Sequence, residues 1–197
     1  MSEKKLALAI ITGSNREGRL GDKIAAWVAD VARATERFSI DMIDVALLDL
    51  PPDYPAEPTA GVLDLRHRIN RAAAFVVVTP EYNHSFPGPL KHALDQAYEE
   101  WRAKPIAFVS YGGVSGGLRA VEALRLVFAE MQAVTIRDGL SFPMAWAIFD
   151  ADGGTPDFHA RLAADVMFGQ LAWWAVALQR ARTELPLQDY MPASAAE

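Results

Sequence analysis

The 197-residue sequence contains no cysteine, so disulfide bonds, thiolate nucleophiles and thiolate-ligated metal sites are excluded. Histidine is scarce as well, and no pair of histidines stands in an H-x-x-x-H or H-E-x-x-H pattern. We therefore expect no metal site, because metal-binding histidines usually recur at such spacings. The four histidines are His67, His84, His92 and His159.

The sequence also lacks an excess of basic residues and any long apolar run. Its formal net charge of −6 argues against a nucleic-acid-binding protein, which normally carries a basic stripe. No apolar run is long enough to span a bilayer. The N-terminal residues MSEKKLALAIITGS have the pattern of a first strand rather than of a signal peptide. We therefore expect a cytoplasmic protein with no membrane or nucleic-acid partner.

The residues that are present indicate one domain over residues 1–197. Hydrophobic residues make up 51% of the chain, and this length is sufficient to bury a sizeable core. Predicted strands cover Leu6–Thr12, Ser39–Val45, Ala73–Thr79, Pro105–Ser110 and Ala133–Arg137. Predicted helices cover Asp22–Ala34, Leu63–Arg71, Pro87–Trp101, Leu118–Met131 and Phe158–Arg182. Apolar strands that alternate with helices predict a doubly wound α/β fold, with a five-stranded parallel sheet and helices on both faces.

The first predicted strand runs into the loop GSNREGR, residues Gly13 to Arg19, and then into a helix. Backbone amides at such a helix start, together with the helix dipole, favour a bound anion. Ser14 adds a hydroxyl, and Arg16 and Arg19 add positive charge. The loop lacks the P-loop pattern and the G-x-G-x-x-G fingerprint, and an ordinary turn with solvated arginines is the alternative. We interpret it as a phosphate site.

Two further loops follow predicted strands, and ligands of open parallel sheets bind at such strand ends. The loop TPEYNHSFPGP, from Thr79 to Pro89, offers backbone and side-chain polar groups to the edge of a flat ring, or caps the next helix. The loop SYGGVSGG, from Ser110 to Gly117, holds four glycines. A turn needs only one or two, so we expect close approach of a ligand. One phosphate site and two ring-binding loops indicate a mononucleotide-like cofactor.

These three segments resemble the NAD(P)H-dependent FMN reductase family of flavodoxin-like proteins, which includes quinone, azo-dye and chromate reductases. The second segment, PEYNHSFPGPLKHALD, is long and specific. The resemblance implies a flavodoxin-like fold, bound FMN, and NADPH or NADH as the co-substrate. It implies a phosphate site of Ser14, Asn15 and Arg16, to which we add Arg19 for its charge, and a ring edge that meets Pro80, Glu81, Tyr82, Asn83 and His84. It places Gly112, Gly113, Val114 and Ser115 near the ring and the phosphate side. Many relatives carry Ser at the position of Arg19, so the role of Arg19 is open.

The resemblance also implies an enzyme in which the nicotinamide passes a hydride to FMN before a quinone, azo or similar small acceptor takes its place. Since the cofactor carries this chemistry, we assign no acid–base residue. His84 either donates a proton or makes a local hydrogen bond, and we favour the second. Two alternative functions remain: a flavin reductase that releases reduced FMN, and a non-enzymatic electron carrier like flavodoxin.

The last predicted helix has apolar residues on more than one face. A surface helix of a monomer normally keeps one face polar, so this pattern predicts a second surface that covers the helix. Burial deep in its own domain is the alternative. The family resemblance likewise implies a homodimer or homotetramer. The residues concerned are Met167, Phe168, Leu171, Ala172, Trp173, Trp174, Val176 and Leu178.

Overall fold

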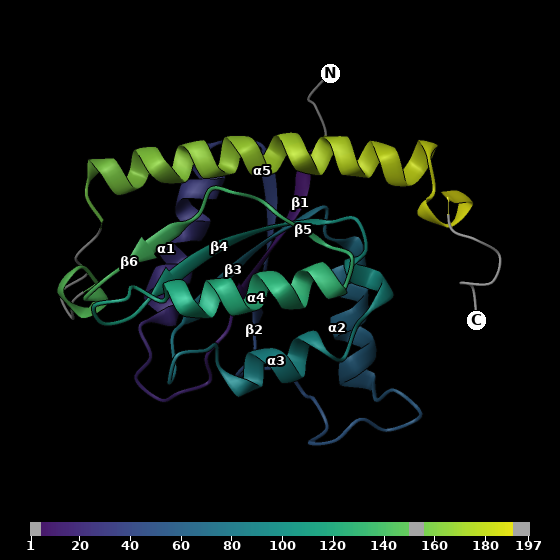
Figure 1. Ribbon diagram of the computed structural model, residues 1–197, viewed down its shortest axis with the longest axis horizontal. Helices are drawn as coiled ribbons and strands as arrows, with labels where there is room; N and C mark the ends of the chain where they lie inside the picture. The colour runs from purple at the N-terminus through teal and green to yellow at the C-terminus, as the bar shows by residue number, and fades with distance from the viewer. Residues whose placement is uncertain (1–4, 150–155, 191–197) are drawn as a thin grey trace.

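The computed structural model describes residues 5–149 and 156–190 and contains a parallel sheet between two layers of helices (Figure 1). The strands are β1 (Leu6–Thr12), β2 (Phe38–Asp44), β3 (Ala74–Pro80), β4 (Pro105–Tyr111), β5 (Val134–Thr135) and β6 (Leu140–Phe142). Their order is β2-β1-β3-β4-β5, and β6 also pairs with β4. All the strand pairs are parallel, which confirms the predicted sheet and fold class.

The last position of the sheet differs from the prediction of a single strand over Ala133–Arg137. Two short strands share that position, because β5 pairs with the start of β4 and β6 with its end. Between them the chain crosses close to β4 at Gly139, where a Cβ atom would lie 2.8 Å from the carbonyl oxygen of Phe108. The sheet therefore has six strands in five positions.

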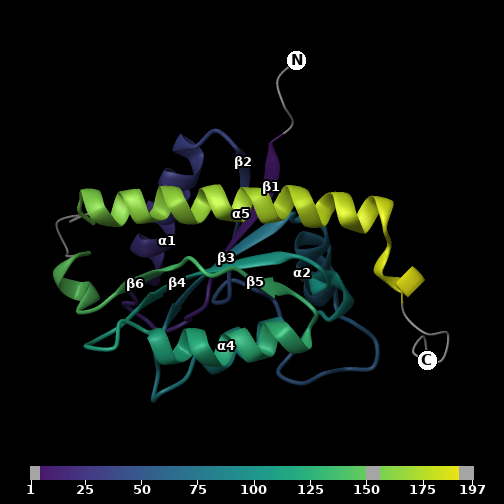
Figure 2. The same ribbon diagram turned by 45° about the horizontal axis from the view of Figure 1, so that its top comes forward.

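The helices divide between the two faces of the sheet. They are α1 (Gly21–Ala34), α2 (Ala60–Arg71), α3 (Gly88–Leu94), α4 (Leu118–Glu130) and α5 (Phe158–Glu184), with short 3-10 helices η1 (Glu99–Trp101), η2 (Ala145–Ala147) and η3 (Leu187–Tyr190). The long helix α5 lies beside α1 on one face, and α2, α3 and α4 cover the other (Figures 1 and 2). This arrangement confirms the expected doubly wound architecture.

The helix predicted over Pro87–Trp101 ends early, at Leu94. Trp101 lies in η1 instead, and its indole Nε1 donates to the carbonyl oxygen of Leu94 at 3.3 Å. The ring is fully buried between Phe75 and Phe128. Burial of this large side chain under the sheet therefore takes precedence over continuation of the helix.

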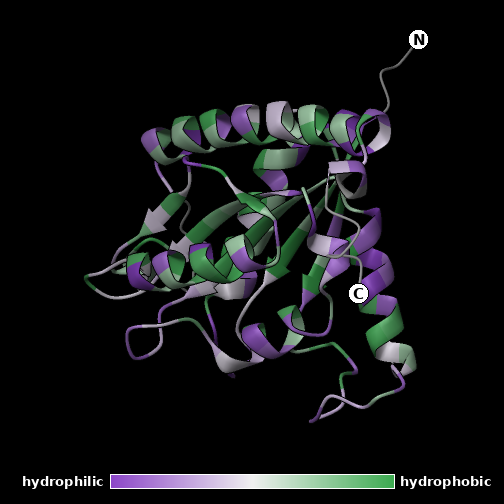
Figure 3. Cartoon of the chain, turned by 45° about the vertical axis from the view of Figure 1, so that its right-hand side comes forward, coloured by the Kyte–Doolittle hydropathy of each residue, from purple (hydrophilic) through white to green (hydrophobic). Residues whose placement is uncertain are grey.

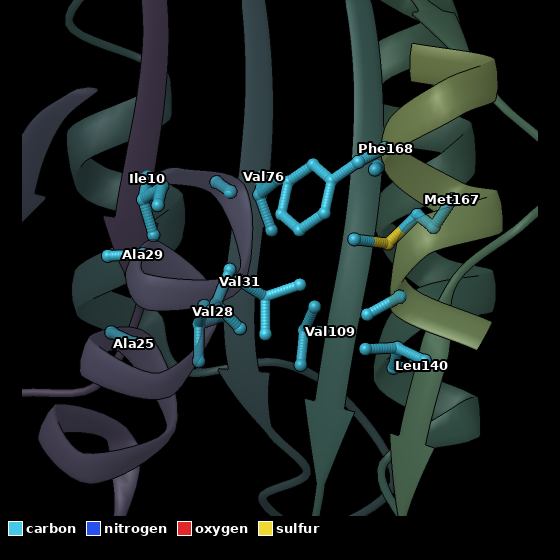
Figure 4. Close-up of a cluster of buried hydrophobic side chains, with 14 of the residues drawn as sticks. Ile10, Ala25, Val28, Ala29, Val31, Val76, Val109, Leu140, Met167 and Phe168 are labelled. Carbon is cyan, nitrogen blue, oxygen red and sulfur yellow. The ribbon is translucent and has the colours of Figure 1, made fainter. Parts of the chain in front are cut away.

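Two hydrophobic clusters, one on each face, enclose the sheet. Figure 4 shows the first, in which side chains of α1 and α5 such as Val28 and Phe168 face Val76 and Val109 on the strands. The second lies under α2, α3 and α4. Colouring by hydropathy shows the apolar strands at the centre and mixed helices around them (Figure 3). Within residues 5–149 and 156–190, no helix has the length and apolar character needed to cross a membrane.

Lys104 is a buried cation at the edge of the sheet opposite to the loops that follow β1, β3 and β4. Its Nζ donates to the carbonyl oxygens of Ile69 and Asn70, each at 2.7 Å, and so completes the last turn of α2. Burial, aided by the charge of Arg182, lowers the pKa of Lys104 to about 7. A neutral amine keeps two hydrogens, so both hydrogen bonds survive deprotonation.

We expect Lys104 to make the protein more stable as the pH rises above neutral. The unfolded chain holds the Lys104 proton up to the ordinary pKa of 10.5, whereas the folded chain loses it at about 7. Between those values the unfolded state binds more protons, so the free energy of unfolding rises by up to about 1.4 kcal/mol per pH unit. Urea unfolding of the wild type and Lys104→Met at several pH values measures the difference. Equal pH slopes in the two proteins would contradict it.

Candidate functional site

Three loops meet at the carboxyl edge of the sheet because β1, β3 and β4 are neighbours and run parallel. They are residues 13–20 after β1, residues 81–87 after β3 and residues 112–117 after β4. The amide of Gly13 donates to Val78 at 2.8 Å, and the amide of Glu81 donates to Tyr111 at 3.3 Å. The sheet pairing therefore extends into the loops and holds their first residues together.

The loop after β1 is organised around Ser14, which is fully buried. Its hydroxyl lies 2.7 Å from the hydroxyl of Tyr82 and accepts the backbone N–H of Arg16 at 3.2 Å. In the part of the chain that the structure describes, the amides of Asn15, Glu17 and Gly18 make no hydrogen bond. These outward amides beside the N-terminus of α1 form a site suited to an anion such as a phosphate.

The two arginines of this loop have different environments. Arg19 is nearly buried, donates to the carbonyl oxygen of Ser14, and pairs with Asp22 at 2.7 Å and with Asp44. Burial opposes its charge, yet the two carboxylates raise the pKa of Arg19. Arg16 is exposed and forms no ion pair with any described residue. Arg19 thus stabilises the loop from its buried side, and Arg16 remains available to bind a ligand.

Tyr111 places a buried hydroxyl under the same loop. The oxygen lies against the Gly21 backbone at the start of α1 and makes no hydrogen bond of ordinary geometry. Burial raises the pKa of Tyr111 well above its ordinary value, and Tyr82 adds to the shift. A buried hydroxyl without a partner costs free energy, which a polar ligand group nearby would recover.

The loop after β3 closes in a tight hairpin turn. Tyr82 and Ser85 exchange both backbone hydrogen bonds, at 2.8 and 3.1 Å. Asn83 and His84 occupy the turn with φ of 49° and 73°, the left-handed conformations that such two-residue turns require. Both side chains are exposed at the tip, whereas Pro80 is buried at the end of β3.

Glu81 joins this loop to the one after β4. Its side chain is only 8% exposed, and its carboxylate pairs with the Arg119 guanidinium at 2.7 Å. The same carboxylate accepts the hydroxyl of Ser115 at 2.9 Å and the backbone N–H of Arg119 at 3.2 Å. Because Arg119 lies in the first turn of α4, Glu81 ties both loops and that helix into one unit.

The four glycines after β4 have two different roles. Gly116 and Gly117 have φ of 59° and 85°, and a Cβ on Gly117 would lie 2.8 Å from the Cβ of Ser110. The fold itself therefore requires these two glycines. Gly113 has only the ring of Trp146 near its missing Cβ, at 3.8 Å, and Gly112 also has room. The surface at Gly112 and Gly113 is open to a flat ligand.

A hollow of about 340 Å³ adjoins the first loop. It is lined by Asn15, Val45, Leu48, Leu50, Gly88, Pro89 and His92. The imidazole of His92 lies 2.7 Å from the carbonyl oxygen of Pro51 and so fixes the loop between β2 and α2 to α3. In the described ranges, no group of three or more His, Asp or Glu residues is arranged to bind a metal ion.

Three residues at the site were not among the site residues predicted from the sequence: Tyr111, Arg119 and Trp146. Trp146 comes from η2, which is held to the glycine loop by Met144 N–H to Gly113 at 3.0 Å and Ala145 N–H to Gly112 at 3.2 Å. Trp146 is 54% exposed, and Val114 in the same loop as Gly113 is 91% exposed. For Trp146, the only signal in the sequence is that this tryptophan lies outside the predicted helices and strands.

Comparison with known proteins gives consistent matches along the chain. Residues 6–147 match the family model described as NADPH-dependent FMN reductase. An NAD(P)H-dependent FMN reductase of Schizosaccharomyces pombe is 36% identical over 69% of this chain and 73% of its own length. A quinone reductase of Pseudomonas putida is 32% identical over 89% of this chain and 97% of its own. The solved structure of a flavoenzyme NAD(P)H:(acceptor) oxidoreductase from Paracoccus denitrificans superposes with a TM-score of 0.73 at 26% identity, over 87% and 98% of the two chains.

The two classes of glycine predict that substitution by alanine affects stability strongly at one position and little at the other. Gly117→Ala combines a left-handed backbone with contacts below 3.0 Å, so we expect a loss of at least about 2 kcal/mol. Gly113→Ala, its matched control in the same loop, should change the free energy of unfolding by less than about 0.5 kcal/mol. Thermal and urea unfolding measure both. Equal destabilisation by the two variants would show that the assignment of their roles is wrong.

Proposed function

Because the chain belongs to the NADPH-dependent FMN reductase family, we propose that it is an FMN-dependent enzyme that oxidises NAD(P)H and reduces a quinone-type acceptor. The observation that carries the proposal is the meeting of an anion-binding loop with two ring-sized loops at one edge of the sheet. All three loops lie within the matched residues 6–147. A reductase of this kind works where its nucleotide is regenerated, and we propose the cytoplasm as its location.

The phosphate end of FMN fits the loop after β1. The free amides of Asn15, Glu17 and Gly18 and the exposed guanidinium of Arg16 are donors suited to a dianion. The buried Ser14 hydroxyl, bonded to Tyr82 and to the Arg16 amide, holds the loop that presents these donors. Arg19 supports the phosphate site by donating to the Ser14 carbonyl oxygen and by pairing with the carboxylates of Asp22 and Asp44.

The ring end fits the surface between the hairpin turn and the glycine loop. Backbone polar groups of the turn at Tyr82, Asn83 and His84 suit the heteroatom edge of an isoalloxazine, and Gly112 and Gly113 allow its plane to approach the backbone. Bound FMN supplies the hydride chemistry, so the side chains serve to bind the ring, orient it and leave one face open. The acceptor is a small molecule, because the relatives are quinone and FMN reductases.

We expect Arg16→Ala to weaken FMN binding about tenfold or more, since a charge-assisted hydrogen bond contributes about 1.5–3 kcal/mol. Riboflavin, which lacks the phosphate, should bind both proteins equally. Arg137→Ala removes an exposed arginine outside the site and is the matched control. Titration of apoprotein with FMN, FAD and riboflavin by flavin fluorescence gives the three affinities. An equal loss of affinity for FMN and riboflavin would show that Arg16 stabilises the protein rather than binding the phosphate.

Helix α5 supports a proposed homodimer. Its inner side chains Ala164, Met167, Phe168, Leu171 and Ala175 are buried against the sheet and α1. On the same helix Leu162, Val166, Trp173 and Val176 are more than half exposed. The domain covers one face of the helix, and these four large apolar side chains, together with Phe158 in the first turn, remain on the rest of its surface. A second copy of the chain is the partner that we propose for them.

Trp173→Glu should convert a dimer to a monomer, because a buried charge without a partner is costly in an apolar interface. Light scattering at low micromolar concentration measures the mass of the wild type and the variant. Lys23→Glu introduces the same side chain at an exposed position of α1 and serves as the control. A wild-type protein with the mass of one chain would refute the proposed interface.

A further inference from the structure

The imidazole of His84 is held in a defined position at the rim of the site. It lies at the tip of the hairpin turn, where φ of 73° is unfavourable for a non-glycine residue. The paired backbone bonds between Tyr82 and Ser85 maintain this conformation. The side chain is therefore presented to solvent on a rigid turn rather than on a loose loop.

Arg119 determines which nitrogen of that ring carries hydrogen. Its Nη1 lies 3.1 Å from Nδ1 of His84. A guanidinium group only donates hydrogen bonds, so Nδ1 must accept. The hydrogen of the neutral ring is then on Nε2, at the far side from Arg119.

Arg119 is in turn fixed by Glu81. The Nε atom of Arg119 is 2.7 Å from a carboxylate oxygen of Glu81, which is almost buried. Glu81 also accepts the Ser115 hydroxyl and the Arg119 amide, so its carboxylate is held from three directions. The chain of contacts from Glu81 through Arg119 to His84 connects a buried charge to an exposed ring.

We propose that His84 uses its Nε2–H as a fixed hydrogen-bond donor to a carbonyl oxygen of the electron acceptor, with Arg119 and Glu81 as positioning residues. The inference rests on the proposed function for the existence of that acceptor. A neutral imidazole donates a hydrogen bond and keeps its proton, so His84 selects and orients the acceptor without acting as its acid. Acceptors with a ring carbonyl, such as quinones, are the class that this donor favours.

The orientation of His84 is tested directly by nitrogen NMR of protein labelled in its histidines. Wild-type His84 should show the Nε2–H form alone, and Arg119→Met should produce a mixture of both forms. Arg119→Lys keeps a donor and should restore part of the preference. His67, exposed on α2, is the internal control. A wild-type His84 that already shows a mixture would overturn the proposed geometry.

The contact with the acceptor is tested by steady-state kinetics of the FMN-loaded enzyme. His84→Ala should raise KM for 1,4-benzoquinone about three- to tenfold, the value of one hydrogen bond, and should raise KM for NAD(P)H by less. His84→Gln retains an N–H donor and should recover most of the loss. Ferricyanide has no carbonyl group, so the loss with benzoquinone should exceed any loss with ferricyanide, and His67→Ala should behave as wild type.

Two results separate failure of this inference from failure of the proposed function. Equal losses with benzoquinone and ferricyanide would overturn the contact with the carbonyl group and leave the enzyme activity standing. A wild-type protein that reduces neither acceptor would overturn the proposed function and the acceptor role together. The NMR result still decides, in that case, whether Arg119 orients His84.

Discussion

The parallel pairing of β1, β3 and β4 is the constraint on which the whole site depends. Registers such as Thr12 with Val78 and Pro80 with Tyr111 bring the ends of these strands to one edge. The loops after them then need only short side-chain links to form one surface. Ser14 with Tyr82 supplies one link, and Glu81 with Ser115 supplies the other. Both links are largely shielded from solvent, so the loops resist rearrangement even though their tips are exposed.

Some groups at the site hold its loops in place, and others are exposed where a ligand can contact them. Arg19 and Arg16 stand three residues apart, yet one is paired beneath the loop and the other is exposed. Gly117 and Gly113 differ in the same way, since packing requires the first and leaves room at the second. A site of this kind keeps its binding groups fixed before the ligand arrives, which reduces the entropy lost on binding.

Local sequence patterns predict much of the fold, but they do not predict the side-chain contacts of the site. Two of the three apolar strands, β3 and β4, are buried along their whole length, and β1 is buried from Leu8 onward, as expected of strands in a parallel sheet. All three were predicted within one residue at each end. Strands β5 and β6 have two and three residues, too few for any periodicity, and their pairing depends on β4. The pairing of Arg19 with Asp44 spans 25 residues, and that of Glu81 with Arg119 spans 38. Such partners follow from the folded backbone, which local sequence patterns do not specify.

In the function that we propose, this edge of the sheet holds FMN and passes electrons from a nicotinamide to a small acceptor. The most direct measurement is the visible absorption spectrum of the FMN-loaded protein without oxygen, after dialysis. We predict a retained flavin absorption that bleaches when NADPH or NADH is added and returns when a quinone follows, with no other protein present. A protein that retains no flavin, or whose flavin absorption fails to bleach with either nucleotide, would contradict the account.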